Sequence, residues 1–269
     1  MEALSPLLAQ APQAGTLVLA CLSVAVAGVL RGLTGFGFAL AAVPLLSMFL
    51  VPAQAVALVI CMQALVGFRD VVQVGRLVEW PAVARLSAGA VVGTPAGVAL
   101  LAWLNPAAMR LAIAALVGIG LAMLLRPGRA PVPAPVPAPG GEDPSARGAL
   151  PTGVLSGLFG GLAAMAGPPA IVWVMRGGRP PAVMRASLMV FFFATSVIAA
   201  PMLVWNGVLD LEVLILGLCA LPVLILSTSA GARLFARTSD AGYRRVALGV
   251  LAAMAAASAL RGALDLMGG

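Results

Sequence analysis

The chain has 269 residues, of which 62% are hydrophobic and 9% are charged, and its formal net charge is +7. The hydrophobic residues come in runs of about twenty, the length of helix that crosses a bilayer, so the composition excludes a water-soluble globular protein. All 16 basic residues are Arg and stand mostly between the hydrophobic runs, which indicates membrane topology rather than a nucleic-acid-binding surface.

The residue types that most enzymes use are scarce. The chain has no His and no Lys, which removes the commonest general base and metal ligand and the residue that forms Schiff bases. Cys21, Cys61 and Cys219 are scattered through hydrophobic segments at no metal-ligand spacing. The sequence therefore predicts no enzyme, no cofactor and no metal site.

Ten hydrophobic segments are predicted, all of them helical. No basic residue precedes Arg31, so the first segment is interpreted as a membrane span rather than a signal peptide. The sixth and seventh segments overlap, and whether the second and seventh span the membrane or re-enter it stays open. The segments are 15–31, 33–51, 53–69, 81–103, 107–125, 149–165, 162–177, 182–205, 211–235 and 241–263.

Residues 127–147 form a Pro- and Gly-rich stretch that is typical of a polyproline or disordered linker. We expect it to join a first transmembrane unit, 1–126, to a second, 148–269. Cytoplasmic connections carry an excess of Arg. With the N-terminus outside, 14 of the 16 Arg residues fall on inner connections and only Arg110 and Arg261 do not. This predicts a multi-pass protein of the cell membrane with both termini outside and a cytoplasmic linker.

An internal repeat relates the two units. Residues 28–35 match residues 153–160 at an offset of 125, with six identities in eight positions. The order of matches continues, with Pro44 on Pro169 at the same offset, Pro52 on Pro181 after a four-residue insertion, and then Thr94 on Thr228, Gly97 on Gly231 and Arg110 on Arg244. Because five segments per unit is an odd number, the second unit enters the membrane from the opposite face, as in inverted-repeat transporters. The alternative is chance similarity between Ala- and Gly-rich helices.

Each unit opens with a glycine-rich interruption, at residues 31–37 and at residues 157–161 with Gly167-Pro168-Pro169. Gly costs about 1 kcal/mol and Pro about 3 kcal/mol relative to Ala inside a helix. In hydrocarbon such breaks persist only where the backbone is buried in protein or lines a watery cavity. Paired breaks in two halves indicate a transport site. The alternative is that the glycines permit close helix packing.

These features resemble the TauE/SafE-type sulfite exporters, also called the toluene sulfonate uptake permease family. The matching features are residues 28–37 and 153–161, Pro44 and Pro169, Pro52 and Pro181, and residues 93–97. Many members have a fuller run of glycines where this chain has Phe36 and Phe38. The resemblance implies secondary transport of small sulfur-containing or carboxylated anions such as sulfite and sulfoacetate, with export as the expected direction. The lipid bilayer is the other expected partner, and nucleic acid is not one.

The residues themselves also favour an anion. Helix N-termini exposed at the breaks present N–H groups and positive dipole ends, and Arg31 lies within the first break. Arg31 is equally interpretable as an ordinary inner charge, and the polar side chains as partners of nearby backbone. The candidate substrate-binding residues are Arg31, Gly32, Thr34, Gly35, Phe36, Gly37, Gln63, Gly160, Gly161, Gly167, Trp173, Ser187 and Thr195.

The acidic residues in and beside the segments are expected at connections rather than deep in a span: Asp70, Glu79, Asp210 and Glu212. This placement disfavours proton coupling through a buried carboxylate. A sodium site of backbone carbonyls and an uncoupled path driven by the membrane potential both stay open. A non-transporting membrane assembly subunit is the alternative function, and it predicts that the glycine breaks are packed shut.

Overall fold

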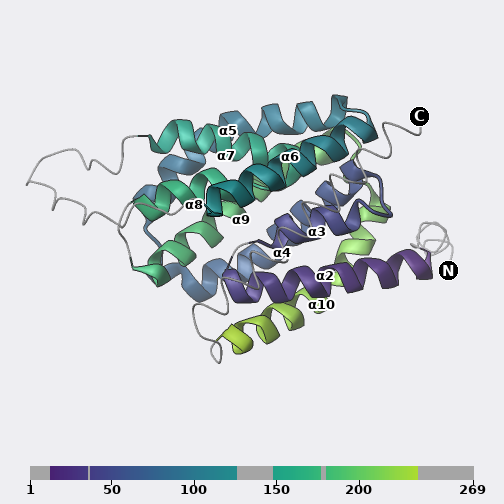
Figure 1. The fold of residues 1–269 in the computed structure, drawn as a ribbon, viewed down its shortest axis with the longest axis horizontal. Helices are drawn as coiled ribbons and strands as arrows, with labels where there is room; N and C mark the ends of the chain where they lie inside the picture. The colour runs from purple at the N-terminus through teal and green to yellow at the C-terminus, as the bar shows by residue number, and fades with distance from the viewer. Residues whose placement is uncertain (1–12, 36, 126–147, 177–179, 236–269) are drawn as a thin grey trace, which may run out of the picture.

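The structure is a computed structural model that describes residues 13–35, 37–125, 148–176 and 180–235. Over these residues the chain is helical, without strands, which confirms the expected all-α class (Figure 1). The predicted linker and the tenth segment lie outside the described residues. The helices are α2 (Ala14–Thr34), α3 (Phe38–Leu46), α4 (Pro52–Val74), the 3-10 turn η1 (Gly75–Leu77), α5 (Trp80–Trp103), α6 (Pro106–Leu125), α7 (Ala149–Ala163), α8 (Gly167–Arg176), α9 (Pro181–Trp205) and α10 (Leu211–Phe235).

Five of these helices, α2, α4, α5, α9 and α10, are long and apolar enough to cross a membrane. The shortest α-helices are α3, with nine residues, and α8, with ten. At 1.5 Å per residue they rise by only about 14 and 15 Å, half of a hydrocarbon core of about 30 Å. Neither helix crosses a membrane by itself, which favours the re-entrant interpretation of the second and seventh segments.

Large apolar side chains on the outside of the helices are exposed. Phe68, Val72 and Leu226 are each about 70% exposed, which suits contact with lipid rather than water. Trp103 and Trp205, the last residues of α5 and α9, are 90% and 91% exposed. Tryptophans gather at the membrane–water interface because the ring is apolar and its N–H is polar. The surface is therefore that of a protein held in a bilayer.

Two close helix pairs form opposite sides of the bundle, with α5 beside α7 on one side and α2 beside α10 on the other (Figure 1). Small residues make both contacts. A Cβ added at Gly93 would overlap the Val154 carbonyl, and one added at Gly32 would overlap the Thr228 carbonyl. In lipid, helices associate through such close backbone approach because there is little hydrophobic force between them.

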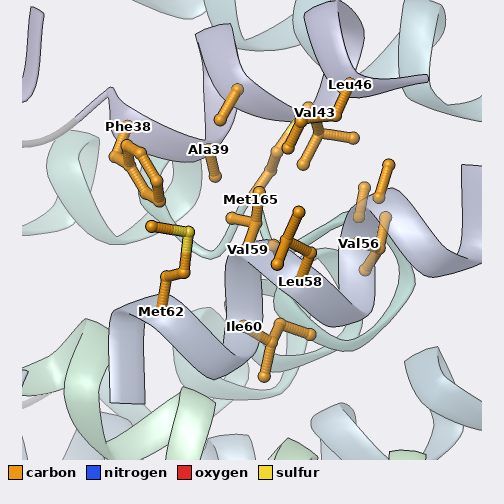
Figure 2. Close-up of a cluster of buried hydrophobic side chains, with 14 of the residues drawn as sticks. Phe38, Ala39, Val43, Leu46, Val56, Leu58, Val59, Ile60, Met62 and Met165 are labelled. Atoms are coloured by element: carbon orange, nitrogen blue, oxygen red, sulfur yellow. The ribbon is translucent and has the colours of Figure 1, made fainter. Parts of the chain in front are cut away.

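The remaining described helices lie between these pairs and contain the centre of the core. Figure 2 shows α3 facing α4, with Phe38 pointing toward Met62 and Met165 lying between the two helices. Leu46, Met62 and Met165 are at most 2% exposed. Met165 belongs to the segment between α7 and α8, which is the second helix break. The core therefore packs this break against α3 and α4, the two helices that follow the first break.

Candidate functional site

The first helix break lies between α2 and α3. Gly35 ends α2 with a φ of 75°, and its N–H donates to the carbonyl of Arg31 at 2.7 Å. Gly37 precedes α3 with a φ of 91°. Side chains are disfavoured at these left-handed angles, which Gly adopts without strain, so both positions suit Gly.

The second break lies between α7 and α8. Ala164 has a φ of 59°, and it is the non-Gly residue with a positive φ in the described part of the chain. Its N–H donates to the carbonyl of Gly160 at 2.8 Å, which closes the end of α7. A left-handed Ala costs of order 1–3 kcal/mol and persists where surrounding packing holds it, commonly at functional sites.

A pocket lies where the two breaks meet. It has a volume of about 40 Å³. One water needs roughly 10–15 Å³ on this scale, so the pocket has room for roughly three waters or one small oxyanion. The lining comes from α2, α3, α4, α8, α9 and both breaks: Arg31, Gly35, Gly37, Phe38, Ala39, Leu40, Gln63, Ala164, Met165, Gly167, Met189 and Phe192.

Arg31 is the charged residue of this lining, and it is 8% exposed. Its Nη2 donates to Oδ2 of Asp70 in a buried ion pair that joins α2 to α4. Its Nη1 is buried and has no hydrogen-bond partner among the described residues. A buried N–H without a partner costs free energy, more so when the group is charged, so this atom is a strong candidate to meet a ligand.

The position of Asp70 corrects the expectation that the acidic residues stand at connections. The hydrophobic run ends at Phe68, but α4 continues to Val74, and Asp70 inside it is 6% exposed. Its charge is tolerated there because Arg31 is its partner. Asp70 also shares a helix face with Gln63, seven residues and two turns earlier. The seven-residue spacing of these two polar residues in a strongly hydrophobic helix is the feature of the sequence that could have predicted a polar helix face.

The two short helices offer different numbers of donors to the pocket. The first turn of any helix has N–H groups without intrahelical partners, and Gly37 has no side chain to cap those of α3. Phe38, Ala39 and Leu40 in this turn all line the pocket. In α8, two of the first three residues are Pro168 and Pro169, which have no N–H. The start of α3 therefore offers more unpaired backbone N–H groups to the pocket than the start of α8 does.

Five predicted residues line the pocket: Arg31, Gly35, Gly37, Gln63 and Gly167. The carboxamide oxygen of Gln63 accepts a hydrogen bond from Ser196 at 3.4 Å. The side chain of Thr34, like the whole of Phe36, lies outside what the structure describes, so their roles stay predictions.

The other predicted residues lie away from the pocket lining. Gly161 packs against the Thr94 carbonyl of α5, as Gly32 packs against α10, so both fit the helix-packing alternative. Gly160 faces Ala166 across the second break. Ser187 accepts the Glu79 N–H at the start of α5, Thr195 donates to the Phe192 carbonyl of its own helix, and Trp173 packs with a second buried cluster.

One face of α9 covers the site and was not predicted as a unit. Met189 and Phe192 line the pocket, and Ser196 contacts Gln63. Arg185, on the same face, donates to the Gly32 carbonyl at 3.3 Å near the end of α2, and a Cβ added at Gly35 would overlap its side chain. The spacing of these four residues matches one side of a helix. Apolar pocket residues of this kind carry no sequence signal that separates them from core residues.

Comparison with known proteins shows which family the chain belongs to. The profile of the family described as sulfite exporter TauE/SafE matches residues 20–258. The chain is 31% identical over 226 residues to the probable sulfite/organosulfonate exporter TauE of Cupriavidus necator, covering 81% of this chain and 84% of that protein. No solved structure matches the chain. The chain thus belongs to the TauE/SafE family of membrane transporters, as its repeated motifs suggested, and it is not an enzyme.

Proposed function

We propose that the chain exports a small sulfite- or organosulfonate-type anion through the pocket between the two helix breaks. The observation that carries the proposal is the unpartnered Nη1 of buried Arg31 in a pocket of oxyanion size. The name of the Cupriavidus relative supplies the substrate class and the direction. A scaffold subunit with its breaks packed shut does not account for the pocket.

The chemistry of the pocket suits one oxyanion. The guanidinium supplies positive charge and a planar fork of donors, which matches two oxygens of a sulfonate or sulfite. The first turn of α3 adds backbone N–H groups and a positive dipole end. Phe38, Met165, Met189 and Phe192 supply an apolar wall that keeps the site of the oxyanion away from lipid and water.

The helix contacts support two inverted copies. If α2 corresponds to α7 and α5 to α10, the pair α2–α10 is the image of the pair α7–α5, and both are the close pairs of the bundle. The matching residues agree, since Gly32 meets Thr228 and Gly157 meets Thr94. Helices α3 and α8 are likewise both short and both follow a break. Exchange of partners between the halves is what an inverted repeat produces.

The orientation follows from the Arg residues. The C-terminal ends of α2 and α10 and the N-terminal ends of α7 and α9 lie toward the same end of the bundle (Figure 1). Arg31, Arg233 and Arg185 belong to three of these ends. By the excess of Arg on cytoplasmic sides, this end is cytoplasmic.

We expect a single Cys probe at Glu142 to be protected in intact cells and one at Asp210 to react with an impermeant thiol reagent from outside. Labelling of the Glu142 probe from outside would overturn the orientation.

Binding of candidate anions to the purified protein tests the substrate class. We expect sulfite and short alkyl sulfonates to raise the unfolding temperature in a saturable way, because a ligand that binds only the folded form stabilises it in proportion to ln(1 + [L]/Kd). Chloride at equal ionic strength is the control for salt effects. Efflux of the stabilising anion from loaded proteoliposomes then tests transport. A protein that no anion stabilises and that mediates no efflux is not the exporter proposed.

A further inference from the structure

The ion pair between Arg31 and Asp70 occupies only one of the two terminal nitrogens of the guanidinium. Asp70 accepts a hydrogen bond from Nη2 alone, while Nη1 of the same group has no partner among the described residues. Both side chains are 9% exposed. A carboxylate and a sulfonate present similar oxygens to an Arg, so Asp70 holds the position that one oxygen of a substrate anion would take.

Building on the proposed function, we propose that Asp70 is an internal competitor of the transported anion for Arg31. It binds the guanidinium while the pocket is empty, and the substrate displaces it. The incoming oxyanion first accepts from Nη1, which is free, and then takes Nη2 from the carboxylate. Because the exchange passes through the free nitrogen, the guanidinium has an anionic partner at every stage.

The competitor has a use in an empty transporter. A buried Arg without a partner is strongly unfavourable, and removing one member of a buried pair commonly destabilises a protein. Asp70 relieves this while no substrate is present. While Asp70 is bound to Arg31, its negative charge repels an incoming substrate anion in a site of low dielectric. Displacing Asp70 costs the interaction energy of the ion pair. Only an anion that binds both guanidinium nitrogens offsets this cost, so the pair selects for bidentate oxyanions.

The alternative role for Asp70 is to orient Arg31 toward the substrate. The two roles predict opposite signs for removal of the carboxylate charge. A competitor, when removed, leaves tighter binding. An orienting residue, when removed, leaves weaker binding. A pair that only joins α2 to α4 leaves binding unchanged. The sign of the change in affinity therefore decides between them.

The test measures sulfite and methanesulfonate binding to purified Asp70→Asn by calorimetry. The matched control is Glu212→Gln, which removes one negative charge from an exposed position in the first turn of α10. We expect Asp70→Asn to bind about tenfold more tightly than the parent, the lower end of what one charge-assisted hydrogen bond contributes. Glu212→Gln should bind like the parent. In the Arg31→Gln, Asp70→Asn double variant the gain should vanish.

Weaker or unchanged binding by Asp70→Asn overturns the inference while leaving the proposed function intact, provided that the parent binds these anions. A parent that binds neither anion overturns both. If Asp70→Asn does not fold, infrared difference spectroscopy of the parent decides the matter, with the Arg31→Gln, Asp70→Asn double variant as the reference. Saturating sulfite should change a carboxylate stretching band that is missing from the double variant, and the absence of any carboxylate change in the parent overturns the displacement.

Discussion

Arg31→Gln is expected to weaken binding of the transported anion by about 10- to 150-fold. The substitution removes a charge-assisted hydrogen bond, which contributes about 1.5 to 3 kcal/mol. Gln keeps a similar length and one amide donor group, so the shape of the pocket is largely retained. Arg31→Lys should be intermediate, since it keeps the charge but loses the bidentate fork. Titration of the stabilising anion by thermal shift measures all three proteins on one scale.

The burial of Asp70 requires a matched background for this measurement. Arg31→Gln alone leaves the Asp70 carboxylate buried without its partner, which destabilises the protein for a reason unrelated to substrate. Comparing Asp70→Asn with the Arg31→Gln, Asp70→Asn double variant avoids the unpaired carboxylate, because neither protein has one at position 70 and the two differ only in Arg31. Membrane orientation should be unchanged, since the other inner Arg residues remain. Equal anion affinity in these two variants would show that Arg31 is only a topological charge and that recognition rests on the backbone N–H groups.

The helices could be predicted from the sequence because hydrophobic length and proline both mark them. Nine of the ten predicted segments fall on described helices, and Pro52 and Pro181 stand at the start of α4 and α9, as expected for a residue that has no N–H to offer. The lengths of α3 and α8 could not be predicted. The segment of α3 is no less hydrophobic than the spans beside it, and the turns that shorten both helices depend on glycine and alanine torsions.

The register of the second break could not be predicted either. The matched glycines place it at an offset of 125, with Gly160 opposite Gly35. In the structure Thr34 and Ala163 end their helices 129 residues apart, and Phe38 and Gly167 begin theirs at the same spacing. If the two units are copies of one repeat, as we propose, the four-residue insertion lies before the break and not after Pro169. The left-handed residue is Ala164, which no glycine marks, and Gly160 is left one turn inside α7.

The site itself was predictable in part. Arg31, Gly35, Gly37, Gln63 and Gly167 line the pocket, because a charge, a helix break or an amide in a hydrophobic segment is visible along the chain. The hydroxyls of Ser187 and Thr195 are equally visible but bond nearby backbone, which depends on helix rotation. The partner of Arg31 lies 39 residues away on another helix. Long-range ion pairs of this kind become apparent only when the helices are placed.

Gly35→Leu is expected to abolish anion efflux, and it has a matched control in Gly207→Leu. Both glycines have left-handed torsions, with φ of 75° and 68°, so both substitutions cost about 1–2 kcal/mol in backbone strain. The surroundings differ, because a Cβ at Gly35 would overlap the Arg185 side chain beside the pocket, whereas a Cβ at Gly207 meets no atom within 4 Å.

The pair of variants thus separates the effect of backbone strain from the effect of obstructing the pocket. Gly207→Leu should fold and transport like the parent. Gly35→Leu must displace Arg185 from the end of α2 and place a branched side chain at the pocket wall, where about 40 Å³ leaves no room for it together with an anion. Efflux from proteoliposomes, normalised to the monodisperse protein recovered, measures both. Efflux at the parent rate in Gly35→Leu would mean that the anion does not pass between the two breaks.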